Sequence, residues 1–110
     1  MTYSASYGTI ETVKLKTVEE FDDWLNSLST KQEAQVRARL TNIELYEHFG
    51  NVKHLGDSLI ELKWKSGMRV YFTHARDSKG RLLLLLLGGH KNAQKKDIKE
   101  ARKLLEKYSS

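Results

Sequence analysis

The sequence predicts an α+β fold in which helices pack on a mostly antiparallel sheet, in the order β-α-α-β-β-β-α. Three patterns support this prediction. Apolar residues recur at helical spacing within residues 17–48 and 92–108. Residues 60–64 and 70–72 alternate with a period of two, as half-buried strands do. Six consecutive leucines, 82–87, are typical of a strand buried on both faces. We expect one domain spanning residues 1–110.

The N-terminal part of the chain is expected to form a strand and a first helix. Residues 9–15 alternate, imperfectly, between apolar and polar types. Thr17 and Glu20 have the spacing of a capping box, so a helix is expected to begin there. An apolar stripe follows at the spacing i, i+3, i+4, i+7, made by Phe21, Trp24, Leu25 and Leu28.

A second helix is expected directly afterwards. Thr30 and Glu33 form another capping-box pattern, and the apolar stripe of this helix continues to about His48. Gly50 is suited to a left-handed residue after the helix. Two helices joined by so short a link predict an antiparallel helical hairpin.

The C-terminal half is expected to form a sheet followed by a helix. Ser66-Gly67 marks a turn between two strands, and residues 77–80 mark a second turn. The leucine strand is expected to end at Gly88-Gly89. Asn92 is positioned to cap a last helix, with one apolar face formed by Ile98, Ala101, Leu105 and Tyr108.

Composition excludes several classes of protein. The chain has no cysteine, which excludes disulfides, thiolate chemistry and cysteine-ligated zinc. The four histidines lack the i, i+4 spacing of a helical metal site, so no metal or other cofactor is expected; they are His48, His54, His74 and His90. No secretory signal is expected, and the longest apolar run is too short to cross a bilayer. We expect a cytoplasmic protein.

Charge is distributed unevenly along the chain. Residues 1–52 contain five Lys and Arg against eight Asp and Glu, a net charge of −3. Residues 53–110 contain fourteen against six, a net charge of +8. Such asymmetry indicates a surface for a polyanion, and RNA fits best. A solvated lysine-rich face is the alternative.

The register of the hairpin at Ser66-Gly67 sets which side chains share a face. A strict two-residue loop would pair Trp64 with Arg69 and bury the arginine on the apolar face, at a cost of several kcal/mol. A three-residue loop avoids this by pairing Lys65 with Arg69. One face then holds Ile60, Leu62, Trp64, Val70 and Phe72, and the other holds Glu61, Lys63, Lys65, Arg69, Tyr71 and Thr73.

The polar face and the loop after the leucine strand are the candidate site. Cations bind phosphate, and Tyr71 could stack a base. The segment Gly88-Gly89-His90-Lys91 leads into a helix N-terminus, where backbone amides favour anions. The alternatives are a solvated outer sheet face and a tight turn with two exposed polar side chains.

These groups could together cleave RNA through its own 2′-hydroxyl. A base removes the hydroxyl proton, cations stabilise the phosphorane, and an acid protonates the leaving 5′-oxygen. Glu61 or a neutral lysine could be the base, Arg69 and Lys63 could stabilise charge, and His90 or Lys91 could be the acid.

Two segments of the chain resemble the RelE/HigB toxin superfamily, closest to its "addiction module killer protein" branch. The first is Leu59-Ile60-Glu61-Leu62-Lys63-Trp64 with Arg69-Val70-Tyr71-Phe72, preceded by Lys53-His54-Leu55-Gly56. The second is Leu84-Leu85-Leu86-Leu87-Gly88-Gly89-His90-Lys91 with Gln94 and Asp97-Ile98. The resemblance covers nearly the whole chain.

The resemblance implies a RelE-like fold and a toxin of a type II toxin–antitoxin pair. Such toxins cut mRNA in the ribosomal A site without a metal, and a helix-turn-helix antitoxin, HigA-like in this branch, neutralises them. Arg69 matches the phosphate-stabilising arginine, and His90 or Lys91 matches the basic or acid position after the last strand. The candidate RNA-binding residues are Lys53, Lys65, Tyr71, Lys95 and Lys96.

The chain departs from this family at two positions. Glu61 stands where well-studied relatives have a lysine base, and Asp97 stands where some have a tyrosine. The identity of the base therefore stays open. Two other functions also stay open: a gyrase-directed toxin of the ParE type, and a non-catalytic basic module that binds RNA or an acidic partner.

Overall fold

The computed structural model describes residues 13–109 of the chain. None of the helices in this range is long and apolar enough to span a membrane. The elements, in chain order, are β1 (Lys14–Thr17), α1 (Glu19–Asn26), α2 (Thr30–Tyr46), β2 (Val52–Gly56), β3 (Leu59–Lys63), β4 (Met68–Asp77), β5 (Gly80–His90), the 3₁₀ turn η2 (Lys91–Ala93) and α3 (Gln94–Ser109).

The strands form a single five-stranded sheet in the order β1-β5-β4-β3-β2. β1 runs parallel to β5, and the other neighbouring strands are antiparallel. The predicted α+β class and the mostly antiparallel sheet are therefore confirmed. The predicted element order is one strand short, because β2 was not distinguished from β3.

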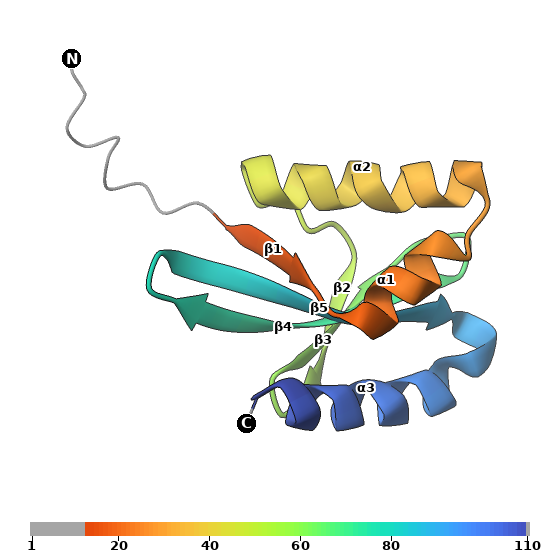
Figure 1. The fold of residues 1–110 in the computed structure, drawn as a ribbon. Helices are drawn as coiled ribbons and strands as arrows, with labels where there is room; N and C mark the ends of the chain where they lie inside the picture. The colour runs from red at the N-terminus through yellow and green to blue at the C-terminus, as the bar shows by residue number, and fades with distance from the viewer. Residues whose placement is uncertain (1–12, 110) are drawn as a thin grey trace, which may run out of the picture.

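Helices cover both faces of the sheet (Figure 1). α1 and α2 lie over one face, where their buried side chains, including Phe21, Val36 and Ile43, meet Val70 and Phe72 of β4. α3 lies across the other face and buries Ala101 and Leu104 against the sheet. β5 contributes buried leucines to both cores, so the prediction of a strand buried on both faces is confirmed.

The first strand ends later than predicted, and the first helix begins later. Residues 9–12 of the predicted strand lie outside the described residues, and β1 runs on to Thr17. Thr17 therefore belongs to the strand and does not cap the helix. α1 instead begins after Val18, which makes no side-chain capping bond. Pairing of β1 with β5 satisfies the backbone here, so the predicted capping box is not formed.

The second helix is capped one residue earlier than predicted. The Ser29 hydroxyl accepts a hydrogen bond from the backbone N–H of Gln32, and the Gln32 side chain accepts from the backbone N–H of Ser29. This is a capping box with glutamine in the third position. α2 ends at Tyr46, because Glu47 adopts a left-handed conformation with φ of 54°. Gly50, the predicted stop, has φ of 71° and lies in the link to β2.

β2 and β3 are separated by a tight turn that the sequence signals only weakly. Asp57 and Ser58 both have positive φ, as the central residues of a type I′ turn require. A type I′ turn usually has Asn-Gly or Asp-Gly at its centre. Ser58 stands in place of the glycine, so the sequence does not predict the turn. The stretch from Val52 onward therefore reads as one strand, whereas the structure folds it into a hairpin.

The hairpin between β3 and β4 has a three-residue loop, as predicted, but the loop is Lys65-Ser66-Gly67: Trp64 N–H donates to Met68 O and Gly67 N–H donates to Trp64 O, both at 3.0 Å. Lys63 pairs with Arg69, and Glu61 pairs with Tyr71. The predicted register was therefore wrong by two residues. Because side chains alternate with a period of two, a shift of two keeps the same residues on the same face.

The end of β5 and the start of the last helix also differ from the prediction. β5 continues through Gly88 and Gly89 to His90, because β4 supplies pairing partners as far as Met68. The His90 side chain, and not Asn92, takes the capping position: its Nδ1 accepts from Asn92 N–H at 3.4 Å. A 3₁₀ turn then leads into α3.

Gly88 allows α1 to pack closely on β5. A side chain at this buried position would overlap the ring of Trp24. We expect Gly88→Ala to lower the free energy of unfolding by about 1–3 kcal/mol, because a large ring in a packed core would have to move. Urea denaturation measures this change. Gly89→Ala is the matched comparison, since its methyl group meets only the tip of the Asp97 side chain. Equal losses in the two variants would contradict this account.

Candidate functional site

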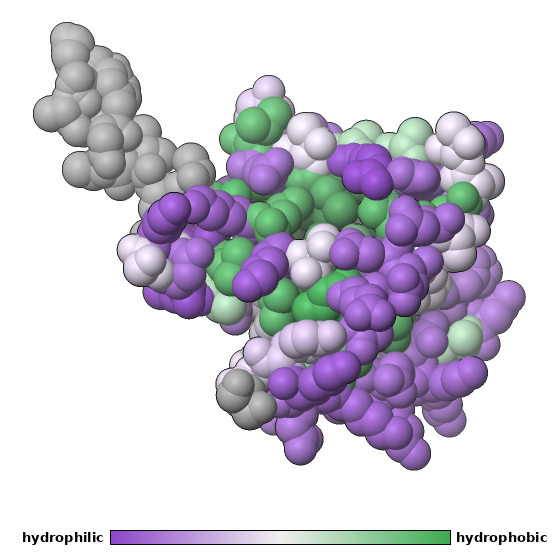
Figure 2. Space-filling view, in the orientation of Figure 1, coloured by the Kyte–Doolittle hydropathy of each residue, from purple (hydrophilic) through white to green (hydrophobic). Residues whose placement is uncertain are grey.

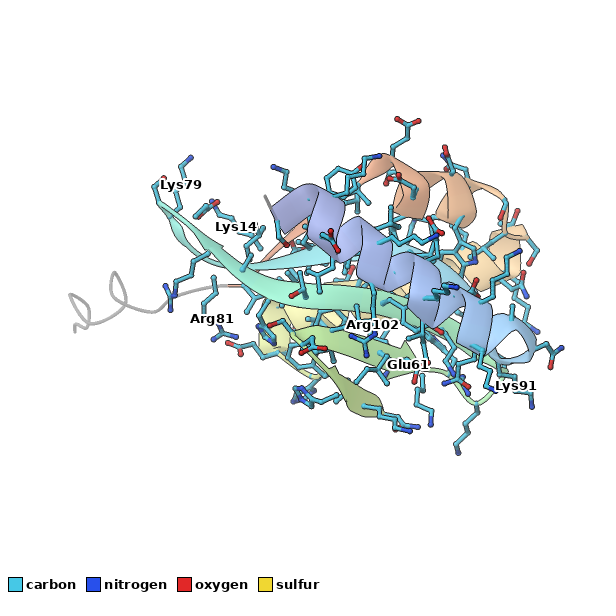
Figure 3. The ribbon with its side chains drawn as sticks, turned by 90° about the horizontal axis from the view of Figure 1, so that it is seen from below. Lys14, Glu61, Lys79, Arg81, Lys91 and Arg102 are labelled. Atoms are coloured by element: carbon cyan, nitrogen blue, oxygen red, sulfur yellow. The ribbon has the colours of Figure 1, made fainter. Side chains whose placement is uncertain are left out.

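The predicted site residues converge on one end of the sheet, where the β3–β4 loop meets the start of α3. Cross-strand pairing places Lys63, Arg69 and Gly89 in one row. The next row on the same face contains Lys53, Glu61 and Tyr71. Figure 3 shows Glu61 and Lys91 at this end of the molecule. Alternation along the strands therefore predicted correctly that Glu61, Lys63, Arg69 and Tyr71 share one face of the sheet.

The polar face is not an open surface, because α3 covers it. Glu61 and Tyr71 are fully buried, Thr73 is 4% exposed and Arg69 is 9% exposed. The expectation of an exposed polar sheet face is corrected by these values. The ring of Tyr71 packs with Leu59, Leu86 and Ala101. With α3 in place, the Tyr71 ring cannot stack on a base.

A buried network links β3, β4 and α3. The side-chain amide of Gln94 donates a hydrogen bond to Glu61 Oε2 at 2.8 Å. Arg69 Nε lies 3.8 Å from the same oxygen. Arg69 Nη1 donates to the backbone oxygens of Met68 at 2.9 Å and of Trp64 at 3.1 Å. These contacts fix the guanidinium at the sheet end beside the β3–β4 loop.

Three buried polar atoms in this network have no hydrogen-bond partner: Glu61 Oε1, Arg69 Nε and the Tyr71 hydroxyl. Burial, followed by the nearby Glu61 carboxylate, raises the pKa of the Tyr71 hydroxyl, so it remains protonated. Unpaired buried polar atoms cost free energy, and their concentration in one place is typical of a functional site.

Asp97 reaches the same region from α3. A side chain at Gly89 would overlap its carboxylate, which shows how closely the helix approaches β5. Partial burial is the main cause that raises the pKa of Asp97, and the charge of Lys96 opposes it. Asp97 also contributes to the raised pKa of Tyr71. Sequence analysis named Gln94 and Asp97 through the family resemblance but assigned neither of them a role in the site.

Exposed cations surround the buried network. Lys65 lies in the β3–β4 loop, His90 ends β5, and Lys91 begins η2. The loop and the end of β5 are joined, because Lys91 N–H donates to Gly67 O at 2.8 Å and the His90 ring lies against Gly67. Lys95 and Lys96 are exposed on the first turn of α3, Lys63 is partly buried, and Lys53 is exposed on the edge strand β2.

Arg39 of α2 is a structural residue that sequence analysis missed. Its guanidinium donates to the backbone oxygens of Phe49, Asn51 and Lys63, at distances between 2.5 and 3.0 Å. It also lies 4.4 Å from the centre of the Trp64 ring. Arg39 thereby holds the link after α2 and the end of β3 in place, immediately behind the candidate site.

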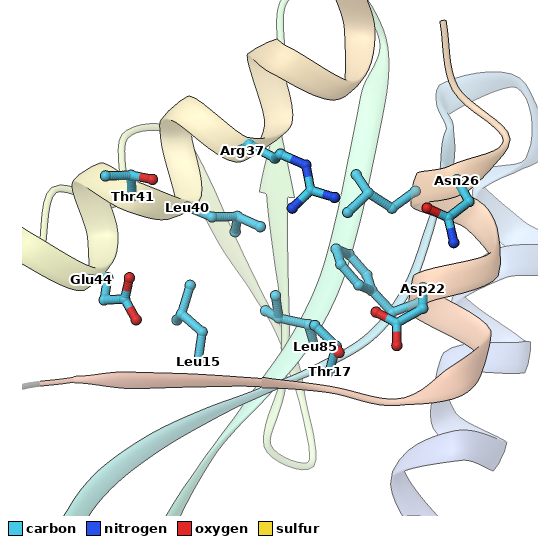
Figure 4. Close-up of a pocket in the computed structure, with 11 residues that line it drawn as sticks. Leu15, Thr17, Asp22, Asn26, Arg37, Leu40, Thr41, Glu44 and Leu85 are labelled. Carbon is cyan, nitrogen blue, oxygen red and sulfur yellow. The ribbon is translucent and has the colours of Figure 1, made fainter. Parts of the chain in front are cut away.

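A separate hollow of about 420 Å³ lies between β1, α1 and α2. Figure 4 shows apolar side chains at its base, including Leu15, Leu40 and Leu85, with Asp22 and Glu44 at its sides. Figure 2 shows the corresponding apolar surface between the helices. None of the predicted site residues lines it. Across residues 13–109, no three His, Asp or Glu side chains come together as a metal site would require.

Comparison with known proteins identifies a family whose members this chain resembles in sequence. Residues 23–108 match the family described as "Phage derived protein Gp49-like (DUF891)". An uncharacterized protein of Haemophilus influenzae is 35% identical over 94 residues, which cover 84% of this chain and 93% of that protein. No solved structure matches the chain.

Proposed function

The chain belongs to the family of phage-derived Gp49-like proteins, which is associated with toxin-like function, and from this premise we propose that it is the toxin of a type II toxin–antitoxin pair. We further propose that it has a RelE/HigB-like activity, cutting mRNA on the ribosome without a metal ion. The single observation that supports this most is the buried Glu61–Arg69–Gln94 network beneath a rim of exposed cations.

The proposed reaction uses the RNA's own 2′-hydroxyl as the nucleophile. Its oxygen forms a bond to the adjacent phosphorus while the bond to the 5′-oxygen breaks, giving a 2′,3′-cyclic phosphate and a free 5′-hydroxyl. One proton leaves the 2′-hydroxyl, and one is delivered to the 5′-oxygen. In this proposal Arg69 and the lysines at the rim stabilise the charge of the phosphorane.

Burial suggests how the roles are divided. Glu61 is fully buried and bonded to Gln94, so we assign it to orienting Arg69 and not to proton transfer. His90 and Lys91 are exposed beside the loop, so we assign the two proton transfers to them. Lys53, Lys63, Lys65, Lys95 and Lys96 would hold the RNA backbone. Tyr71 is assigned to packing under α3.

A neutralising partner is part of this proposal. Type II toxins of the family that the chain resembles are held inactive by an antitoxin, and a helix-turn-helix protein encoded next to this gene would fill that role. An acidic segment of the partner would suit the exposed cations around Arg69.

Induced expression in a bacterial host tests the proposal. Growth should stop, and coexpression of the neighbouring antitoxin should restore it. Mapping of RNA ends should reveal discrete cuts in translated regions, in frame with codons. The downstream fragments should carry 5′-hydroxyls, which a polynucleotide kinase labels without prior phosphatase treatment. DNA damage with intact mRNA would instead indicate a gyrase-directed toxin and would contradict the proposal.

Separate variants of His90 and Lys91 should distinguish their roles. We expect His90→Ala and Lys91→Ala each to lower the cleavage rate about 100-fold, the usual contribution of one proton-transfer group. Cleavage of a ribosome-bound mRNA, measured across pH, should lose a different limb of the pH profile in each variant. Lys103→Ala, an exposed lysine further along α3, is the control. Full activity in both variants would contradict the assignment.

A further inference from the structure

The hairpin of β4 and β5 extends beyond the rest of the sheet. Pairing between β3 and β4 ends at Ile60 and Phe72, whereas β4 and β5 remain paired as far as Asp77 and Gly80. We call residues 74–83 the arm. Figure 1 shows it projecting past the helices, with β1 alongside. In Figure 3, Lys79 and Arg81 of the arm lie at the opposite end of the molecule from Glu61 and Lys91.

Cations cover both faces of this end. Arg76 and Arg81 are a cross-strand pair, so their side chains share a face, and Arg81 binds Glu47 of α2 at 2.6 Å. Lys14 and Lys16 flank Leu15, which packs into the core on the α2 side, so they point to the opposite face. Together with Lys79 at the tip, five cations accompany one carboxylate, Asp77, within the arm and β1.

Arg76 and Arg81 place like charges directly opposite each other on neighbouring strands, and Glu47 binds Arg81 of this pair at 2.6 Å. An open hollow of about 370 Å³ lies at the pair, lined by His74, Ala75, Arg76 and Arg81. Burial lowers the pKa of His74 most, the charges of Arg81 and His54 lower it further, and the charge of Glu47 opposes them.

We propose that the arm is a second RNA-binding surface, which holds the phosphate backbone of double-helical RNA away from the cleavage site. Cations on two faces and at the tip of a projecting ribbon fit phosphates on either side of a groove. A protein partner fits less well, because an interface needs an apolar centre. The large apolar side chains that are exposed within residues 13–109 lie on helices: Leu45, Tyr46 and Tyr108.

The arm and the cleavage site are separate binding surfaces. Arg76 lies seven residues along β4 from Arg69, or roughly 23 Å at the rise of an antiparallel strand. This exceeds the Debye length at physiological salt, about 8 Å, so each cluster acts on RNA independently. The inference rests on the proposed function in taking RNA as the ligand, but binding at the arm does not require cleavage.

Binding to an RNA hairpin with a long duplex stem tests the inference. The probe is built from 2′-O-methyl nucleotides, so that it cannot be cut through the 2′-hydroxyl. We expect the double variant Arg76→Ala, Lys79→Ala of the full chain to bind at least about tenfold more weakly, with the salt slope reduced by about two. Arg81 is left intact because it also anchors the arm to Glu47.

The double variant Lys31→Ala, Lys103→Ala is the matched control, because it removes the same charge from exposed positions elsewhere. It should keep the affinity and the salt slope of the unmodified chain. Equal weakening in both double variants, or none in the arm variant, would overturn the inference. If the unmodified chain did not cut mRNA but still bound the probe through the arm, only the proposed function would be overturned.

Discussion

Replacement of Arg69 by alanine is expected to lower the rate of mRNA cleavage by about 100- to 1,000-fold, as the removal of one preorganised charge-stabilising donor does in other enzymes. The guanidinium is fixed by the backbone oxygens of Trp64 and Met68 and lies beside Glu61, so its position is set before RNA binds. Cleavage of a ribosome-bound mRNA by the purified protein measures the loss, and growth after induction reports it in cells. A fully toxic Arg69→Ala protein would show that the site is elsewhere.

The same substitution should also destabilise the fold, and the two effects must be separated. Without Arg69, the fully buried Glu61 carboxylate loses its ion pair, at a cost of about 3 kcal/mol. Adding Glu61→Gln removes that charge and should recover most of the stability. The double variant should remain inactive. If it regained cleavage, Arg69 would be a structural residue and not a charge stabiliser.

Replacement of Arg39 by alanine is expected to lower the stability of the fold strongly. Three backbone oxygens lose a charged donor, and the contact with the Trp64 ring disappears. We expect the free energy of unfolding to fall by about 3 kcal/mol, corresponding to a melting temperature lower by about 12 °C. Thermal unfolding followed by circular dichroism measures both quantities.

Arg37→Ala is the matched control for this prediction. Arg37 lies on the same helix and forms an exposed ion pair with Glu33 at 2.7 Å. Such pairs contribute about 0.3–0.5 kcal/mol, so its removal should scarcely change the melting temperature. If the two arginine variants melted together, the backbone contacts of Arg39 would not be holding the β2–β3 region as we argue.

The sequence predicted which side chains share a face of the sheet better than it predicted what packs against that face. Alternation placed Glu61, Arg69 and Tyr71 on one face, and that placement survived a register error of two residues, because the period of a strand is also two. Periodicity does not indicate what covers a face. α3 has apolar residues on one side, but nothing local shows that it lies over the polar residues instead of beside them.

The predicted ends of helices and strands were wrong where pairing with a distant strand outweighed the local sequence signal. Thr17 has the spacing of a helix cap, yet it pairs with Leu85 as part of β1. Gly88 and Gly89 were expected to end the leucine strand, yet pairing with β4 extends β5 through both residues. Gln94 and Asp97 were named only through the family resemblance and were given no contacts, because a polar residue on an amphipathic helix is usually solvated. Only the fold shows that these two face Glu61 and Gly89.

The parallel pairing of β1 with β5 has a consequence for the order in which the chain assembles. Each hairpin from β2 to β5 closes over a few residues, whereas Lys14 must find Leu82 across most of the chain. Contacts between residues so distant in sequence form slowly, because the entropy of closing the intervening loop is lost before the contact forms. The strands that carry Glu61 and Arg69 can therefore pair locally, while β1 joins the sheet only after β5 has been synthesised.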